Sequence, residues 1–498
     1  MRYYVLHTLG CKANLFDSQL IEAELQKKGW TPFRNGLRNS LNEVQVDICL
    51  VNSCTVTDEA DRQTRKIAAR LHRAHPSAMI VVTGCAAEID PERLAESKGI
   101  SYLIGNRDKP RLVEMILKKW EERTAAPAQD SQELLDASLK GYTEMASRHP
   151  LDREWPGVSV EAPPFDPGST KTRAFMKIQE GCNSFCTYCV IPYGRGPARS
   201  LDADRVLANI RTMEANGFQE IIITGTNIGD YGSDFPEDGQ DRSLESLLER
   251  ILRETRRARI RIGSLDPTEI TPRLLKLLRS EERLCPHFHV SLQSASEPVL
   301  KLMKRRYGLA EVRTALEAIA SLAAPVGGAF VGMDVITGFP GETAERFEAG
   351  LAALKDLPWS RLHIFPYSER AGTPATRLPG VVPQQERVER ARRLSELSLN
   401  RLEAHGKAVL EQCRQEQIPL SKILVESRCR PPANRKSDEQ IWASGYSNNY
   451  LRTYFPVGGI SSRNQLVSVI PEELQVDRAA GEVKFIGKLV EDNTFRYY

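Results

Sequence analysis

The sequence predicts an α/β protein in three parts: a small N-terminal parallel sheet with helices, a central partial (β/α)6 barrel and a small C-terminal β-barrel. Three observations support this fold class. Strand and helix patterns alternate over residues 1–122, the alternation resumes for six units over residues 171–412, and short β-like runs follow within residues 413–498. A length of 498 residues agrees with about three domains.

The N-terminal part is predicted as a parallel sheet because each apolar strand pattern is followed by a helix pattern. Strands are expected at Tyr3–Leu9, Val46–Val51 and Met79–Thr83. Helices are expected at Ser18–Lys28, Asp58–Arg73, Pro91–Glu96 and Arg111–Glu121. Residues 123–170 are richer in proline and alanine, which indicates a linker or a surface insertion with one helix near Ser131–Leu139.

The central part repeats the strand-helix pattern six times. Its strands are expected at Ala174–Gln179, Glu220–Thr224, Ala258–Ile262, His287–Leu292, Ala329–Ile336 and Arg361–Phe365. Helices between them are expected at Ala203–Ala215, Leu244–Glu254 and Glu342–Leu354. Barrels of this kind carry their chemistry at the C-terminal ends of the strands, so we expect the active site there.

The C-terminal part follows a long charged helix, which is expected at Gln384–Leu410. Five β-like runs come after it, at Lys422–Ser427, Gln440–Ser444, Tyr450–Phe455, Leu466–Ile470 and Glu482–Val490. Turn residues separate these runs. Short strands at this spacing favour a small β-barrel.

The composition excludes a wholly disordered or fibrous chain, because 41% of the residues are hydrophobic and 27% are charged. Lys and Arg number 68 against 65 Asp and Glu, so a nucleic-acid surface would have to be local. The apolar run Ala323–Phe339 is interrupted by Pro325 and Asp334, and the N-terminus lacks a signal-peptide pattern. We therefore expect a cytoplasmic protein with no membrane contact, whose ten cysteines are metal ligands, nucleophiles or core residues rather than disulfides.

Three cysteines, Cys182, Cys186 and Cys189, form a C-x3-C-x2-C motif directly after the first expected barrel strand. Three thiolates this close on a glycine-flanked loop can hold three irons of a cubane cluster, which leaves the fourth iron open to a substrate or cofactor. One alternative is a zinc knuckle, but it needs a fourth cysteine or histidine, and none lies between Cys189 and residue 284. The other alternative is packing of all three thiols in the core.

Three further cysteines, Cys11, Cys54 and Cys85, are distant in sequence, yet each follows an expected strand of the N-terminal sheet. Parallel strands end at one edge of a sheet, so we expect these thiols to converge and to fit a second cluster with an open iron. The alternative is three independent core residues. Cys49 lies inside an apolar strand and is expected to pack in the core. The cysteines without a partnered pattern are Cys285, Cys413 and Cys429.

Several residues at strand ends are candidates for a cofactor pocket. A turn that contains Gly225 follows the second expected barrel strand, where a missing side chain lets the backbone approach a ligand. An ordinary tight turn is the alternative. The cofactor-binding candidates are Tyr188, Thr224, Gly225, Asn227, Gln293 and Arg305.

The C-x3-C-x2-C motif, with the aromatic Tyr188 directly before its last cysteine, resembles the radical S-adenosylmethionine (radical SAM) superfamily. With the second cysteine trio, the barrel and the C-terminal β-barrel, the chain resembles the methylthiotransferases of that superfamily. The resemblance implies two [4Fe–4S] clusters, S-adenosylmethionine (SAM) with Tyr188 near its adenine, and a C-terminal TRAM domain. The implied ligands are Cys182, Cys186 and Cys189 for the SAM cluster, and Cys11, Cys54 and Cys85 for the auxiliary cluster.

Within this family, the segments Thr8–Asn14 and Asn52–Ala60 resemble the MtaB branch, which modifies N6-threonylcarbamoyladenosine beside the anticodon of tRNA. Two positions depart from the usual patterns, Ala13 in the first segment and Ser447 in the TRAM-like region. The alternatives are the branch that acts on isopentenyladenosine in tRNA and the branch that acts on an aspartate of a ribosomal protein. A non-catalytic iron–sulfur electron carrier or RNA-binding protein is the alternative from another class.

The resemblance implies a methylthio group inserted at C2 of the modified adenosine, with SAM as both methyl donor and radical source. It also implies three partners: the anticodon loop of tRNA, an electron donor protein and a sulfur source. The expected RNA contacts are the arginines of residues 250–261, the basic group Lys301, Lys304, Arg305 and Arg306, and the aromatic residues Tyr446, Tyr450, Tyr454 and Phe455 beside Arg452. The alternative for the arginines is a helix face that is exposed to solvent. The alternative for the aromatic residues is packing in the core.

Overall fold

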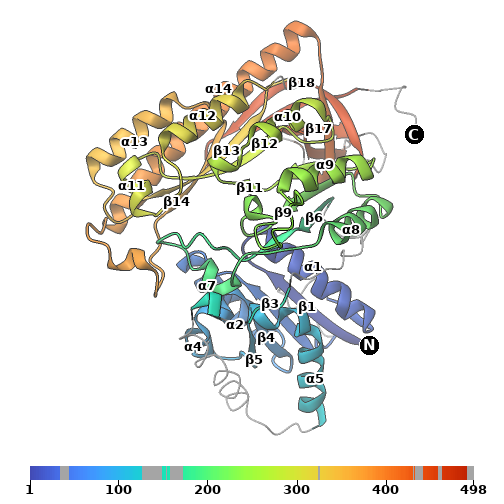
Figure 1. Cartoon of the computed structure of the whole chain (residues 1–498). Helices are drawn as coiled ribbons and strands as arrows, with labels where there is room; N and C mark the ends of the chain where they lie inside the picture. Colours follow the sequence, from blue (N-terminus) through green and yellow to red (C-terminus); the bar gives the residue numbers. More distant parts are fainter. Residues whose placement is uncertain are drawn as a thin grey trace.

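The computed structural model describes residues 1–33, 44–125, 149–152, 154–157, 172–322, 326–429, 431, 441–457 and 463–490. These residues form an N-terminal sheet domain, a central partial barrel and a closed C-terminal barrel, which confirms the predicted fold class. In Figure 1 the N-terminal domain (blue to cyan) lies below the central barrel (green to yellow), and the C-terminal barrel (red) packs at the upper right. The helix expected at Ser131–Leu139 lies outside the described residues.

The N-terminal domain is a five-stranded parallel sheet in the order β2-β1-β3-β4-β5. Its strands are β1 (Arg2–Thr8), β2 (Trp30–Pro32), β3 (Ile48–Ser53), β4 (Met79–Gly84) and β5 (Tyr102–Ile104). Its helices are α1 (Lys12–Lys27), α2 (Asp58–Ala74), α3 (Cys85–Ile89), α4 (Pro91–Ala95) and α5 (Leu112–Ala125). The prediction missed β2 and β5, because strands of three residues give too short a pattern to recognise. It also placed the start of α1 at Ser18, whereas the helix begins at Lys12, directly after Cys11.

The central part is an open barrel of six parallel strands, as predicted. The strands are β6 (Arg173–Lys177), β9 (Glu220–Thr224), β10 (Arg259–Ile262) with β11 (Ser264–Leu265), β12 (His287–Gln293), β13 (Phe330–Thr337) and β14 (Arg361–Pro366). Since β10 pairs with β9 and β11 pairs with β12, the two form one barrel strand that is interrupted at Gly263. An added Cβ at Gly263 would lie 2.8 Å from the carbonyl oxygen of Ile223, so the backbones approach closely at this break.

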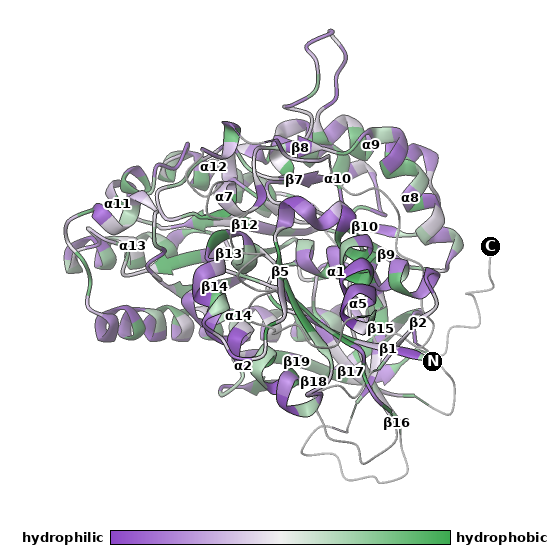
Figure 2. Cartoon of the chain, turned by 90° about the horizontal axis from the view of Figure 1, so that it is seen from below, coloured by the Kyte–Doolittle hydropathy of each residue, from purple (hydrophilic) through white to green (hydrophobic). Residues whose placement is uncertain are grey.

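Helices cover the outer face of this barrel. They are α8 (Ala203–Ala215), α9 (Leu244–Glu254), α10 (Pro272–Ser280), α11 (Glu297–Leu302), α12 (Leu309–Ala320) and α13 (Ala344–Asp356). Their apolar faces and the outward-facing strand residues share one large core. In Figure 2 the inner strands are largely hydrophobic, while the outer faces of α8, α9 and α14 (Gln384–Glu416) are hydrophilic.

The C-terminal part is a closed five-stranded barrel in the order β15-β16-β17-β19-β18, closed by the pairing of β15 with β18. Its strands are β15 (Leu420–Cys429), β16 (Ile441–Tyr446), β17 (Arg452–Val457), β18 (Leu466–Asp477) and β19 (Glu482–Leu489). All five expected runs are therefore strands. The last turns of α14 share the core of this barrel through Val409, Leu410 and Cys413. Among the described residues, no helix combines the length and the apolar character needed to cross a membrane.

Two arginines that were expected to contact RNA lie instead at the joint between the two barrels. Arg259 and Arg261 are buried and form ion pairs with Glu220, which is also buried. Arg261 donates a hydrogen bond through Nη1 to the carbonyl oxygen of Asn448 at 2.8 Å. A guanidinium tolerates burial only when its charge and donors are satisfied in this way, so the two arginines join the barrels and cannot meet phosphates.

The aromatic residues that were expected to stack on RNA bases are also largely structural. Tyr446 and Tyr450 stack on each other with ring centroids 4.6 Å apart, and Tyr450 lies at the same distance from His287 of the central barrel. Phe455 is fully buried in the C-terminal core. This is the core alternative that the sequence left open.

Candidate functional site

The C-x3-C-x2-C loop lies at the C-terminal end of β6, between β7 (Gln179–Glu180) and α7 (Ile191–Arg195). Backbone hydrogen bonds hold the loop at both ends: the amide of Cys182 donates to Gly196 at 3.1 Å, and the amide of Cys189 donates to Cys186 at 2.9 Å. Gly181 has φ 76°, and a Cβ there would lie 1.8 Å from the carbonyl oxygen of Pro197. Only glycine therefore allows the close backbone approach that starts the loop.

The structure brings the thiols of Cys182, Cys186 and Cys189 together. Burial raises the pKa of the Cys189 thiol to about 12, and the adjacent thiols of Cys186 and Cys182 add to this effect. Burial likewise raises the pKa of Cys182. Burial makes the thiolate form of these cysteines unfavourable in the absence of a metal. A bound metal ion supplies the positive charge that stabilises thiolates, so this set of ligands suits iron.

Arg305 lies beside this loop and contacts two of its members. Its Nη1 donates to the sulfur of Cys186 at 3.1 Å and lies 3.5 Å from the hydroxyl of Tyr188. Its Nη2 pairs with Asp266, which follows β11. Tyr188 is itself held edge-on against Phe339, with ring centroids 6.3 Å apart. Two of the residues expected in the cofactor pocket, Tyr188 and Arg305, are therefore in contact with each other and with the cysteine loop.

The turn after β9 forms another side of the site. The hydroxyl of Thr226 accepts a hydrogen bond from the amide of Gly181 at 3.2 Å, and the amide of Asn227 donates to the side chain of Gln179 at 3.0 Å. A Cβ at Gly225 would lie 2.8 Å from the carbonyl oxygen of Gln179, so this approach also requires glycine. The turn from Thr224 to Asn227 thus lies against the cysteine loop.

Gln293, the remaining cofactor candidate, ends β12 on the same rim and has a left-handed backbone with φ 65°. Within the described part of the chain, its side chain makes no hydrogen bond to the loop. Glu269, near the same rim, carried no signal that sequence reasoning could have recognised. Burial, together with the charge of Asp266, raises the pKa of Glu269 to about 7.

The second trio, Cys11, Cys54 and Cys85, also converges. Cys11 lies between β1 and α1, Cys54 follows β3, and Cys85 begins α3 after β4, so all three stand at the carboxyl edge of the parallel sheet. Burial raises the pKa of Cys54 to about 12, and the neighbouring thiols of Cys85 and Cys11 contribute. Gly10, with φ 90°, leaves the space that Cys54 uses, because a Cβ there would lie 2.6 Å from the Cys54 sulfur.

Over the described ranges, no group of three His, Cys, Asp or Glu side chains is arranged to hold a single metal ion. A cubane cluster binds each thiolate to a different iron, so its cysteines stand further apart than the ligands of zinc. Cys49 lies apart from both trios in the apolar core of the N-terminal sheet, as predicted.

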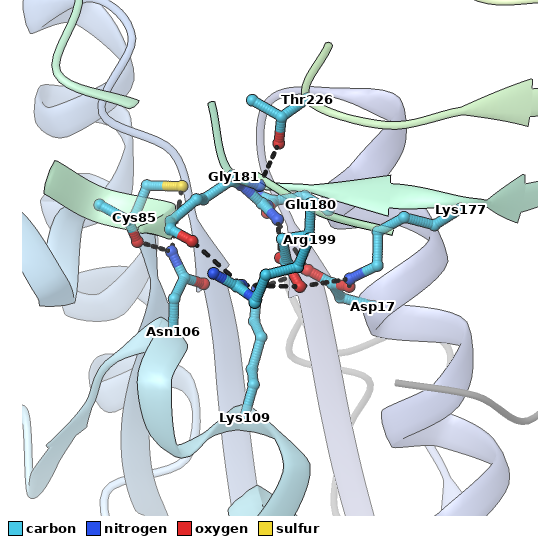
Figure 3. A network of polar contacts seen from close by, with 12 residues as sticks. Asp17, Cys85, Asn106, Lys109, Lys177, Glu180, Gly181, Arg199 and Thr226 are labelled. Carbon is cyan, nitrogen blue, oxygen red and sulfur yellow. Dashed lines mark hydrogen bonds and ion pairs between the residues drawn. The ribbon is translucent and has the colours of Figure 1, made fainter. Parts of the chain in front are cut away.

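Helix α7 connects the two trios. It continues directly from Cys189, and a Cβ at its Gly194 would lie 3.8 Å from the Cβ of Cys85. The Nδ2 of Asn106 donates to the carbonyl oxygen of Gly194 at 2.7 Å and to the sulfur of Cys85 at 3.3 Å. Figure 3 shows Asn106 directed at Cys85. The chain after one trio therefore packs against a thiol of the other.

A buried charge network fixes this arrangement, and sequence reasoning missed it. Arg195 of α7 is 2% exposed and donates to Asn14 of α1 and to Glu180 of β7. Asp17, also on α1, accepts from Lys177 of β6 and from Lys109, the latter at 2.7 Å. Figure 3 shows Asp17, Lys177, Glu180 and Lys109 converging from the N-terminal domain and the barrel. The charges therefore tie the sheet domain to the barrel at the level of the two trios.

Replacing Asp17 with alanine should destabilise the protein by about 3–5 kcal/mol, because it leaves buried cations without their counter-charge. Despite burial, Lys109 and Lys177 lower the pKa of Asp17 below its usual value. A lowered folded-state pKa means that the stabilisation is present above the unfolded pKa, near pH 4, and is lost as the pH falls below it. Urea unfolding of the wild type and Asp17→Ala at pH 7 and pH 2.5 measures both effects, since the stabilisation is lost progressively below pH 4.

The exposed Asp204 of α8, which pairs with Arg250, serves as the control. Asp204→Ala should change the unfolding midpoint little at either pH, since exposed ion pairs contribute little. A loss for Asp17→Ala no larger than that for Asp204→Ala would contradict the role assigned to the network.

Comparison with known proteins agrees with both parts of the site. The model of the radical SAM superfamily matches residues 176–353, and that of the uncharacterized protein family UPF0004 matches residues 3–105. The chain is 34% identical over 421 residues to the threonylcarbamoyladenosine tRNA methylthiotransferase MtaB of Aquifex aeolicus (strain VF5), covering 84% of this chain and 94% of that protein. It is 32% identical to the protein of the same name from Bacillus subtilis (strain 168), covering 91% of this chain and 90% of that protein.

A solved structure shows the same fold. The radical S-adenosylmethionine methyltransferase TsrM from Kitasatospora setae superposes with a TM-score of 0.53 over 73% of each chain, at 16% sequence identity. At this identity the likeness concerns the fold alone.

Proposed function

The chain belongs to the radical SAM methylthiotransferase family, and on that premise we propose that it inserts a methylthio group at C2 of N6-threonylcarbamoyladenosine next to the anticodon of tRNA. The names of the relatives from Aquifex aeolicus and Bacillus subtilis support this substrate. The observation that carries the proposal is the pair of three-cysteine sites joined by α7. Each site offers three thiolates and so leaves one iron of a cubane open, whereas an electron carrier binds each of its clusters with four cysteines.

The enzyme uses two [4Fe–4S] clusters and SAM, which supply the methyl group and the radical chemistry when bound. We assign Cys182, Cys186 and Cys189 to the SAM cluster and Cys11, Cys54 and Cys85 to the auxiliary cluster. The SAM pocket is proposed to be lined by Tyr188, Thr224, Gly225, Asn227, Gln293 and Arg305. Arg305 places a buried positive charge against the Cys186 sulfur, which offsets the charge of a thiolate there.

The chemistry of the target carbon explains why the protein positions the cofactors and the substrate rather than supplying a catalytic acid or base. C2 of adenine carries an unactivated hydrogen that ordinary side-chain acids and bases cannot remove, so the difficult step belongs to the cofactors. The described residues of the site hold the loop and orient Tyr188. They bury Cys54, Cys85 and Cys186, whereas Cys11 is exposed. An electron donor protein and a sulfur source complete the reaction as partners.

The three parts of the chain are proposed to divide this work. Residues 1–122 carry the auxiliary cluster, residues 171–412 form the radical SAM core, and residues 413–498 form a TRAM-like barrel, with residues 123–170 as an insertion between the first two. A tRNA substrate also places the protein in the cytoplasm.

A local basic surface beside the cysteine loop suits the phosphates of the anticodon loop. Lys301, Lys304 and Arg306 are exposed, whereas Arg305 between them is directed inward to the cysteines. Arg306 reaches the carbonyl oxygen of Asn183 in the cysteine loop at 3.5 Å. Phosphates bound here would hold a nucleotide at the mouth of the barrel.

Replacing Lys304 and Arg306 together with alanine should weaken tRNA binding and lower the slope of log Kd against log salt by about two, one for each lost phosphate contact. The measurement is tRNA binding at several salt concentrations. Arg392→Ala is the control, since this arginine lies on α14 and pairs with Glu389 and Glu396 away from the site. An unchanged slope for the double variant would place the RNA elsewhere.

The proposed function is tested by nucleoside mass spectrometry of tRNA from a strain that lacks the gene, with and without complementation. The expected result is loss of the methylthio form of N6-threonylcarbamoyladenosine and its return on complementation. Loss of the methylthio form of isopentenyladenosine would instead assign the other tRNA branch. Unchanged tRNA nucleosides would direct attention to a ribosomal-protein substrate.

A further inference from the structure

A cluster of ionisable side chains on the inner face of the barrel has no part in either cysteine site. The Nε2 of His289 on β12 lies 2.8 Å from a carboxylate oxygen of Asp334 on β13. The ring of His363 on β14 stacks on that of His289, with centroids 5.1 Å apart and planes 7° from parallel. A Cβ at Gly332 would lie 3.3 Å from the Nε2 of His363, so a glycine on β13 makes room for this ring.

These three side chains face open space rather than the core. The residues that alternate with His289 on β12, such as Phe288 and Val290, are buried against the outer helices. His289 and Asp334, in contrast, are 22% and 21% exposed although they lie in the middle of a sheet. His363 also lines a cavity of about 330 Å³ between β14 and α14, which His289 and Asp334 do not line. A polar cluster that served the fold alone would be enclosed and fully paired, as Glu220 and its arginines are.

The cluster lies between Arg305 of the barrel and Lys12 of the N-terminal domain. On one side, the carbonyl oxygen of Ser291 accepts from Arg305, which contacts Cys186. The side chains of His289 and Ser291 lie on the same face of β12, and His289 lies about 7 Å further from the C-terminal end of the strand, two residues away. On the other side is Lys12, which directly follows Cys11. The charge of Lys12 acts on His363.

We propose that His289, Asp334 and His363 bind the polar N6 substituent of the substrate adenosine, and so select a threonylcarbamoyl group over an isopentenyl group. This inference rests on the proposed function and names the residues that set its substrate class. A threonylcarbamoyl group carries a urea and a hydroxyl, which can pair with an imidazole or a carboxylate, and a carboxylate, which can accept from an imidazole N–H. An isopentenyl group has no hydrogen-bonding atom and would leave the cluster desolvated and unpaired.

The charge state of the cluster suits this role. Burial, together with the adjacent His289, lowers the pKa of His363 to about 4. A neutral imidazole offers one donor and one acceptor, which matches a urea better than a fixed charge does. The groups that face His363 from the packed elements are His289, Asp334, Arg361 and Lys12.

The test uses the reconstituted holoenzyme and three anticodon stem–loop RNAs that differ only at the target: threonylcarbamoyladenosine, isopentenyladenosine and unmodified adenosine. The variants are Asp334→Asn and His289→Gln, which keep the size of each side chain close to the original. For the threonylcarbamoyl RNA, each variant should lower kcat/KM by about tenfold to a hundredfold, the effect of losing a hydrogen bond to a charged group. Preference over unmodified RNA should fall by the same factor, while SAM cleavage without RNA should be unchanged.

The control is His72→Ala, since His72 lies on α2 far from the barrel interior in sequence and fold, and its kcat/KM should match the wild type. Iron content is measured for every variant. If Asp334→Asn loses iron, His289→Gln decides, because it leaves the carboxylate in place. Wild-type preference retained in both variants would overturn the inference while leaving the proposed function intact. A wild type that turns over only the isopentenyl RNA would overturn the proposed function itself.

Discussion

Replacing Cys54 with alanine should abolish methylthio transfer while the enzyme continues to cleave SAM. Cys54 is buried at the carboxyl edge of the N-terminal sheet with Cys11 and Cys85, and it is separate from the C-x3-C-x2-C loop of the barrel. Changes to the residues around a metal ligand reduce activity by up to about a hundredfold. Loss of a ligand itself should reduce product formation by more than that. The iron content after anaerobic reconstitution should fall from about eight to about four per chain.

The measurements are iron per chain, 5′-deoxyadenosine formed and methylthio product formed. Cys49→Ala is a matched control, because Cys49 is a buried cysteine of β3, the strand that Cys54 follows, but lies in the apolar core. It should retain about eight irons per chain and both activities. Normal methylthio transfer by Cys54→Ala would refute the assignment of the N-terminal trio.

Replacing Cys182 with alanine should have the complementary effect: SAM cleavage is lost, and methylthio transfer is lost with it. Cys182 begins the loop on the barrel rim, where its amide is bound to Gly196 and its sulfur accepts from the amide of Ser184 at 3.4 Å. Without this thiol the loop retains two ligands, too few for a cubane with one open iron. About four irons per chain should remain, all of them in the N-terminal site.

The control here is Cys285→Ala, which removes a buried cysteine of the same barrel outside the loop. SAM cleavage and iron content should stay at wild-type values. SAM cleavage by Cys182→Ala would show that the barrel site is assigned wrongly, and loss of all iron would show that the two sites do not assemble independently.

The two cysteine substitutions separate functions that the structure places in contact. Helix α7 (Ile191–Arg195) follows Cys189, and Arg195 pairs with Asn14 and Glu180 from opposite sides of the domain boundary. The network around Asp17 holds these elements with buried charges that water cannot replace. We therefore expect the relative position of the two sites to be fixed rather than set by substrate binding.

Much of the fold was open to prediction because its patterns are local. The six barrel strands follow from apolar runs of four to eight residues with helices between them, and β9, α8 and α9 have the predicted bounds. The strands β2 and β5 were missed because three residues are too few to show the alternation of apolar and polar side chains that marks a strand. The arginines of residues 250–261 were misjudged in part, since a row of like charges looks the same whether it faces water or, like Arg261, a buried carboxylate.

The sequence by itself determined the C-x3-C-x2-C loop and its glycine, since the spacing of three thiols on one loop is a property of a few adjacent residues. It also indicated that Cys11, Cys54 and Cys85 meet, because parallel strands end at one edge. Only the tertiary structure decided that α7 packs on Cys85, that Asp17 pairs with lysines of two domains, and that His289, Asp334 and His363 share the inner face of the barrel. These partners come from distant segments, and their contacts depend on how sheets and helices pack rather than on any pattern along the chain.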